Sequence, residues 1–132
     1  YRLFAPLLPH LRAAAERAEP LFPSERDPEP AADVARLWNG LGYHLHAVAD
    51  YTGARESCER ALRIDEAAFG PDHPNVARDV NNLGLVLQAL GDLAGARKCF
   101  ERALGIFQAK LPPDHPHIRT VEGNLRALEA TG

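Results

Sequence analysis

Six histidines and two cysteines are the residues of this 132-residue chain that could bind a metal ion or act as nucleophiles. His44 and His46 are two residues apart in a helical pattern, so their side chains point in different directions. His73 and His115 occupy the same place in two Pro-Asp-His-Pro segments, which favours a role in helix capping. His117 lies two residues after His115 and could share a metal with it only adventitiously. The spacing therefore predicts no metal site.

The two cysteines, Cys58 and Cys99, match neither a disulfide framework nor a zinc-binding pattern. Free thiols in a reducing cytoplasm are their expected state, and Cys58 is expected to act as a small hydrophobic core residue. No Ser or Cys has a recognisable base partner, and no glycine-rich phosphate loop follows a strand pattern. We therefore expect no catalytic residue, no metal and no cofactor.

An internal repeat determines the elements that must position any functional side chain. Residues 76–116 read VARDVNNLGLVLQALGDLAGARKCFERALGIFQAKLPPDHP, and residues 34–74 form an earlier copy that begins 42 residues upstream. Both copies contain Val-Ala-Arg, Leu-Gly, Gly-Ala-Arg, Glu-Arg-Ala-Leu and Pro-Asp-His-Pro at equivalent places. A fixed period in this range is typical of a solenoid built from stacked units.

Composition argues against several classes of function. The net charge of −3 and pI of about 6.1 do not fit a general binder of nucleic acid or of acidic membranes. No run of 18 apolar residues is present, so no transmembrane helix is expected. The chain opens on Tyr1 and holds no Met, which indicates a fragment or processed product, expected to be the C-terminal part of a larger cytosolic protein. Arg outnumbers Lys 13 to 2, which suggests a bacterial genome rich in G and C.

Apolar residues at steps of three and four predict an all-α chain. The stripe of the first unit consists of Val34, Leu37, Trp38, Leu41, Leu45 and Val48. We expect an N-terminal helix at about 8–20 and a Pro-rich connection within 1–30, repeat units at 31–74 and 75–116, and a capping helix within 117–132. Inside the units, the first helix is expected to be capped by Asp33 or an earlier residue and to end at a turn from Asp50 to Gly53. Further helices are expected at about 54–68, 75–90 and 93–110.

The two ends of the array are expected to differ from the middle. Residues 16–18 read Glu-Arg-Ala, like residues 59–61, which suggests a remnant of a preceding repeat. Arg126 and Glu129 stand where the second unit has Gly84 and Leu87. Charged residues there indicate that no partner helix follows, so the natural chain is expected to end at or near this capping helix.

The repeats resemble tetratricopeptide repeats. The residues that carry the resemblance are Trp38-x2-Leu41-Gly42, Ala54-x3-Cys58 and Ala61 in the first unit, and Leu83-Gly84, Ala96-x3-Phe100 and Ala103 in the second. The 42-residue period and the Gly-Pro-Asp-His-Pro linker look like the kinesin-light-chain-type variant, which is also common in bacterial multidomain proteins after a signalling NTPase module. The resemblance implies a right-handed solenoid of antiparallel helix pairs.

The resemblance also implies that ligands bind on the concave face, which the first helix of each pair lines. The residues expected there are Arg36, Asn39, Tyr43, His46, Arg78, Asn81, Asn82, Leu85, Gln88, Thr120 and Asn124. Asn can bond a peptide backbone, Arg can bind a carboxylate, and Tyr43 offers a flat apolar ring. These residues favour a groove for a peptide that is acidic or carries a free C-terminal carboxylate. In the alternative interpretation, Asn39 and Asn81 only bridge neighbouring helices.

Three classes of function remain open. A non-catalytic protein-interaction scaffold is favoured. The second class is a module that associates with itself through Trp38, Leu85 or the exposed face of the first helix. An enzyme has no supporting residues. A signalling NTPase upstream of Tyr1 would make the chain a sensor arm.

Overall fold

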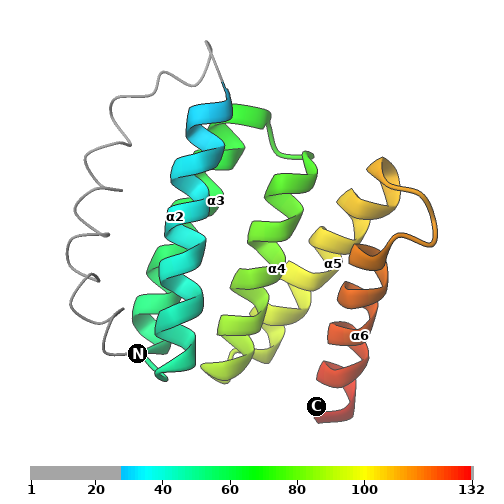
Figure 1. Cartoon of the computed structure of the whole chain (residues 1–132). Helices are drawn as coiled ribbons and strands as arrows, with labels where there is room; N and C mark the ends of the chain where they lie inside the picture. Colours follow the sequence, from blue (N-terminus) through cyan, green and yellow to red (C-terminus); the bar gives the residue numbers. More distant parts are fainter. Residues whose placement is uncertain (1–27, 132) are drawn as a thin grey trace.

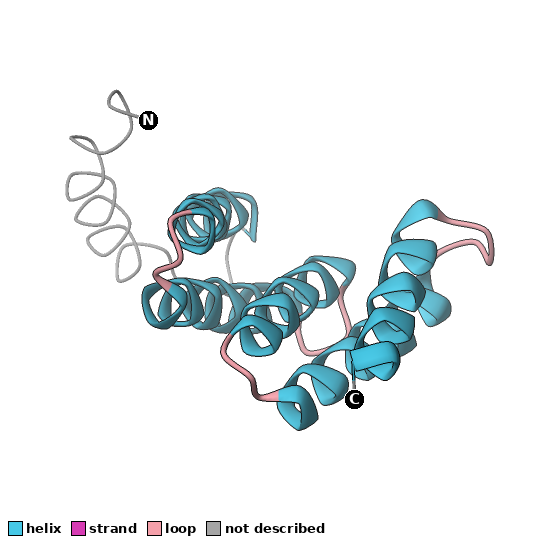
Figure 2. Ribbon diagram, turned by 90° about the horizontal axis from the view of Figure 1, so that it is seen from below, coloured by secondary structure: helices cyan, strands magenta, loops and turns pink. Residues whose placement is uncertain are grey.

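The computed structural model describes residues 28–131, which form five α-helices and no strand. The helices are α2 (Pro28–Ala47), α3 (Tyr51–Phe69), α4 (Pro74–Ala89), α5 (Leu93–Lys110) and α6 (Pro116–Thr131). Two views at right angles show successive helices packed side by side, with α2 against α3, α4 against α5, and α6 after them (Figures 1 and 2). This arrangement confirms the predicted all-α helical solenoid. The helix expected at about 8–20 lies outside the described residues.

The structure locates the start of α2, and one predicted helix start was wrong. Helix α2 begins at Pro28, so the last residues of the expected Pro-rich connection are helical. The first turn of a helix tolerates Pro28 and Pro30 because its N–H groups have no partner within the helix. Helix α3 begins at Tyr51 rather than near residue 54, since Asp50 is its N-cap and accepts a hydrogen bond from the Gly53 nitrogen at 3.1 Å.

The loops between helices follow one plan in both units. Gly91, after α4, has a φ of 88°, and Ala49 takes the equivalent left-handed conformation after α2 with a φ of 64°. Gly70, whose φ is 86°, ends α3 as expected. The ring nitrogen Nδ1 of His73 then accepts a hydrogen bond from the Asn75 nitrogen at 3.0 Å. His115 does the same for His117, also at 3.0 Å, so both linker histidines cap a helix.

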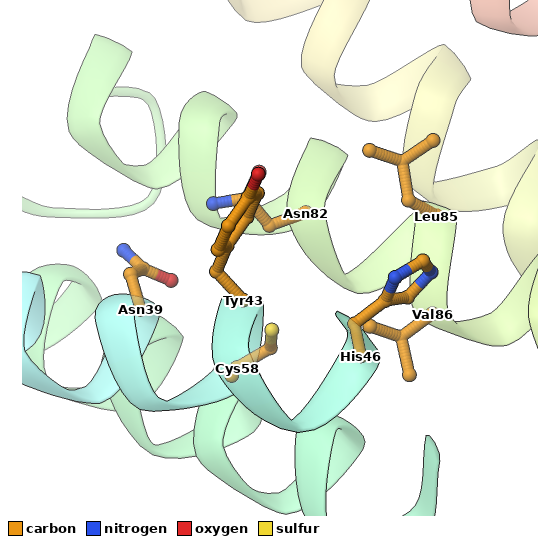
Figure 3. A pocket seen from close by; sticks show the side chains of 8 residues that line it. Asn39, Tyr43, His46, Cys58, Asn82, Leu85 and Val86 are labelled. Atoms are coloured by element: carbon orange, nitrogen blue, oxygen red, sulfur yellow. The ribbon is translucent and has the colours of Figure 1, made fainter. Parts of the chain in front are cut away.

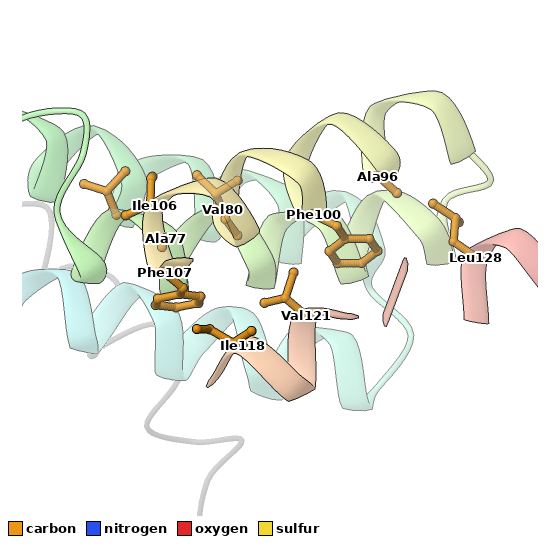
Figure 4. Packing of buried hydrophobic residues seen from close by; sticks show 11 residues of the cluster. Ala77, Val80, Ala96, Phe100, Ile106, Phe107, Ile118, Val121 and Leu128 are labelled. Atoms are coloured by element: carbon orange, nitrogen blue, oxygen red, sulfur yellow. The ribbon is translucent and has the colours of Figure 1, made fainter. Parts of the chain in front are cut away.

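Two hydrophobic clusters form the core. The first is centred on Trp38 and Leu41 between α2 and α3, and the second on Phe100 and Val121 among α4, α5 and α6 (Figure 4). Leu37 and Val48 belong to the apolar stripe identified in the sequence, but they are 40% and 39% exposed. The buried face of α2 is centred on the line from Trp38 to Leu45, about 100° around the helix from Leu37, while Val48 follows the last helical residue.

Glycines allow the two helices of each unit to approach closely. A Cβ atom at Gly84 would lie 2.6 Å from the Phe100 ring and 3.1 Å from the Cβ of Cys99. In the first unit, a Cβ at Gly42 would lie 3.0 Å from the sulfur of Cys58, the residue equivalent to Phe100. Each helix pair therefore depends on one position without a side chain.

We expect Gly84→Ala to lower the free energy of unfolding by about 1–3 kcal/mol, because the added methyl group overpacks the contact with Phe100. Gly105→Ala is the matched control, since a Cβ there meets no atom within 4 Å and Ala favours a helix by about 0.5–1 kcal/mol. Urea unfolding of both variants measures the difference. Equal effects of the two substitutions would contradict the close-packing argument.

Candidate functional site

A pocket lies between the first helices of the two units, α2 and α4. Its volume is about 170 Å³, and Figure 3 shows its lining side chains. The lining residues are Asn39, Gly42, Tyr43, His46, Cys58, Asn82, Leu85 and Val86. Helix α2 supplies one wall, α4 supplies the other, and Cys58 of α3 lies between them. The structure thus brings together five of the predicted concave-face residues: Asn39, Tyr43, His46, Asn82 and Leu85.

The rim of the pocket is apolar on both sides. Tyr43 is 80% exposed, and Leu85, on the opposite wall, is 38% exposed. His46 is exposed as well, and its ring meets the edge of Tyr51 at a centroid distance of 5.3 Å. Large apolar surfaces left open next to a concavity are the usual marks of a binding site.

A difference between the two repeats explains why the first unit has this pocket. In the second unit, the fully buried ring of Phe100 packs against Gly84. The equivalent residue of the first unit is Cys58, which packs against Gly42 with only a sulfur atom. Figure 3 shows this sulfur pointing from the floor of the pocket toward Tyr43. The smaller side chain leaves space that an aromatic ring fills in the other repeat.

Three of the predicted asparagines bond other helices. The Asn39 amide nitrogen donates to Asp79 Oδ1 at 2.7 Å, which links α2 to α4. The Asn124 amide nitrogen donates to Asn81 Oδ1 at 2.9 Å, which links α6 to α4. These bonds agree with the alternative interpretation, in which Asn39 and Asn81 bridge neighbouring helices. Asn82 lines the pocket, and its side chain makes no hydrogen bond within residues 28–131.

The remaining predicted residues lie outside the pocket. Arg36 is half-exposed and pairs with Asp33 at 2.8 Å. Gln88 is half-buried on α4, one turn beyond the pocket. Thr120 donates to the Pro116 carbonyl at 3.0 Å and, with Arg78, lines a smaller cavity of about 60 Å³ between α4 and α6. One apolar pocket therefore lies between α2 and α4, and the remaining predicted residues are distributed along the helices around it.

A family comparison agrees with this architecture. The family model described as Tetratricopeptide repeat matches residues 33–109. The chain belongs to the tetratricopeptide-repeat family. Tetratricopeptide repeats are in general a non-catalytic fold for protein–protein interaction. A comparison with curated proteins finds no match. No helix of this repeat protein within residues 28–131 has the length and apolar character that crossing a bilayer requires.

The tetratricopeptide array also contains a buried pair of acids that the sequence analysis missed. The side chains of Asp65 on α3 and Asp79 on α4 are fully buried. Arg78 lies 3.7 Å from Asp65 Oδ2 and 3.8 Å from Asp79 Oδ1. A repeat alignment carries the signal that could have found the pair, because the positions 42 residues away from these acids hold Phe107, Leu37 and Val121.

One shared proton accounts for this arrangement. Burial, followed by the hydrogen bond and the charge of Asp65, raises the pKa of Asp79 from its usual 3.8 to about 9, although Asn39 and Arg78 act to lower it. The Asn39 amide donates to Asp79 Oδ1, and a protonated Asp79 has an O–H that it can offer to Asp65, whose two buried oxygens have no other hydrogen-bond partner among the described residues. A proton on Asp79 reduces the negative charge that is buried next to the Arg78 cation.

The thiol of Cys58, at the floor of the pocket, is unreactive. Burial is the main cause that raises the pKa of Cys58 to about 12, with smaller contributions from the nearby acids Asp79 and Glu59. The thiolate is the nucleophilic form, so Cys58 serves as a small apolar residue. Burial also raises the pKa of Cys99. Within residues 28–131, no group of three or more His, Cys, Asp or Glu side chains is placed to hold a metal ion.

We expect Asp79→Asn to stabilise the protein at pH 8. The folded state holds a proton on Asp79 between about pH 4 and pH 9 that the unfolded state releases, so stability falls as pH rises through this window. Asn keeps the acceptor for Asn39 and offers an N–H to Asp65 in place of the shared proton. The melting temperature at pH 8 should rise by about 5 °C or more, since each kcal/mol shifts it by roughly 4–8 °C.

The matched control is Asp114→Asn, which removes the same charge from an exposed linker position. Thermal unfolding followed by circular dichroism from pH 5 to pH 9 measures both variants. Asp79→Asn should also flatten the pH profile, whereas Asp114→Asn should leave its slope unchanged. A drop in melting temperature for Asp79→Asn at pH 8 would refute the shared proton.

Proposed function

We propose that this chain binds an extended peptide segment of a partner protein in the groove between α2 and α4. The observation that carries the proposal is the pocket between these helices, with the Tyr43 ring 80% exposed on its rim. A tyrosine at this position adds little to the core, while tyrosines with an open apolar face are frequent binding anchors. The family's general role in protein interaction supports the same conclusion.

Two arginines support a preference for acidic segments. Arg36 and Arg78 lie about one helical turn before Asn39 and Asn82 on the two walls. Their side chains are 53% and 42% exposed, so each can reach a ligand carboxylate in addition to its present partners. An acidic residue or a free C-terminal carboxylate would therefore bind toward the beginnings of α2 and α4.

The charge of the chain favours a protein partner over nucleic acid or a membrane. The net charge of −3 disfavours nucleic acid and acidic membranes. The free thiols of Cys58 and Cys99 favour a reducing compartment, and we propose the cytoplasm.

Self-association is the second candidate function, and the exposed side chain of Leu85 supports it. Trp38 was also expected to serve self-association, but it is 1% exposed and lies beneath Arg60, so this expectation was wrong.

We expect Tyr43→Ala to weaken binding of peptides selected from a random peptide library by about tenfold, because the ring is the largest exposed anchor of the groove. Leu93→Ala is the control, since Leu93 is an exposed apolar residue outside the pocket. Isothermal titration calorimetry of the selected peptides measures both variants.

Two results would count against the groove. Equal losses in Tyr43→Ala and Leu93→Ala would place the peptide elsewhere on the protein. If the library yields no binder and light scattering shows a mass that rises with concentration, self-association replaces peptide binding.

We expect Arg36→Ala to weaken acidic peptides by about twofold to fivefold at low salt, because an exposed ion pair contributes up to about 1 kcal/mol. The difference should shrink as added NaCl screens the charges. Arg63→Ala removes an exposed arginine from α3 and is the control. Arg78 is left unchanged because its loss would leave a buried negative charge without a partner. A salt-independent difference between the variants would contradict the acidic preference.

A further inference from the structure

We propose that the pocket between α2 and α4 takes one apolar side chain of the bound peptide, between leucine and phenylalanine in size, while Asn82 bonds the adjacent peptide backbone. This inference rests on the proposed function, which it deepens by naming what the pocket selects. It depends on four observations: the absence of Asp, Glu, Lys and Arg from the lining, the size of the cavity, the free amide of Asn82 and the distance to the arginines.

The residues that line the pocket disfavour a charged side chain of the peptide. None of the eight lining residues is Asp, Glu, Lys or Arg. Leu85, Val86 and the Tyr43 ring offer apolar surface, and Cys58 stays a neutral thiol. A charged side chain that entered this space would lose hydration without gaining a partner of opposite charge. An apolar side chain would gain by leaving water, so the pocket favours an apolar residue even if the peptide is acidic elsewhere.

The cavity fits a side chain of intermediate size. Its volume is about 170 Å³. An apolar protein cavity of about 150 Å³ accommodates benzene, so one isobutyl or benzyl group fills this space well. The repeat itself offers a parallel, since the ring of Phe100 is buried at the equivalent place of the second unit. The partner's side chain would thus supply in the first unit what Phe100 supplies in the second.

Asn82 is the group that can hold the peptide backbone. Asn39 on the facing wall is committed to Asp79, and the neighbouring Asn81 is committed to Asn124. The Asn82 amide lines the pocket without a side-chain hydrogen bond in the described part of the chain. Its amide can donate to a peptide carbonyl and accept from a peptide N–H at once. These two hydrogen bonds to the peptide backbone would fix which side chain of the peptide enters the pocket.

The walls also set the spacing of the bound sequence. Arg36 precedes Tyr43 by two helical turns on the same face of α2, a separation of about 10 Å along the helix. An extended peptide covers this distance in about three residues. The preferred ligand therefore has an acidic residue or its terminal carboxylate about three residues from the apolar residue.

A set of acidic peptides that differ at one position, with Leu, Phe, Ala or Asp, tests the inference. Leu and Phe peptides should bind about tenfold more tightly than Ala and Asp peptides, as expected for burial of a whole side chain. Leu85→Asp should remove this preference by placing a carboxylate on the wall. Leu90→Asp is the control, because Leu90 directly follows α4 and has a nearly equal exposure of 39% without lining the pocket.

Cys58→Phe gives an independent test, because it fills the pocket as Phe100 fills the second unit. It should abolish the preference for Leu and Phe, with folding checked by circular dichroism, while Leu85→Asp tests the pocket without altering the core. Equal affinity for the four peptides, or equal effects of Leu85→Asp and Leu90→Asp, would overturn the inference. If peptides still bind and Tyr43→Ala still weakens them, the proposed function survives that result. If none of the peptides or library sequences binds, both fail together.

Discussion

The close approach of the two helices in each unit is the contact on which the remaining structure depends. Gly42 and Gly84 permit it because they place no side chain between the helices. The side chain that faces the glycine from the second helix then determines whether the unit has a closed core or a pocket. In the second unit Phe100 fills it and joins a core that extends to α6, whereas in the first unit Cys58 leaves it partly open. One geometry thus produces both a closed core and a pocket.

Much of the fold could be predicted because the sequence signals for helices, caps and linkers occur in both copies of the repeat. Leu-Gly, the Asp caps and the Pro-Asp-His-Pro linkers recur, so a helix assigned in one copy supports the helix in the other. The errors occur where a residue has two physical options. Pro28 fits either a loop or a first helical turn, and Leu37 lies near the buried face without belonging to it. Such choices depend on neighbouring helices that the local pattern does not contain.

The candidate site was predictable only in part, because side chains with the same chemistry serve different neighbours. Helical spacing assigned Asn39, Asn81 and Asn82 to the concave face, yet Asn39 and Asn81 bond other helices. Asn82 lines the pocket with a side chain that makes no hydrogen bond within residues 28–131. The difference arises from Asp79, whose burial no periodicity of apolar residues would suggest. Asn39 is held by this acid, so a structural requirement at the junction of α2, α3 and α4 removes a group from the groove.

The buried acids and the pocket together indicate how a repeat protein gains a specific site. Both features occupy positions where the other units carry large apolar residues: Asp79 is equivalent to Leu37 and Val121, and Cys58 is equivalent to Phe100. The acids join the two units through Asn39, Asp65 and Arg78, which fixes the wall of α4 relative to α2. A fixed separation of these walls is what keeps a half-open apolar cavity from collapsing once its aromatic residue is missing. The departures from the repeat, rather than the residues that the repeats share, therefore make the surface between α2 and α4 different from the rest of the array.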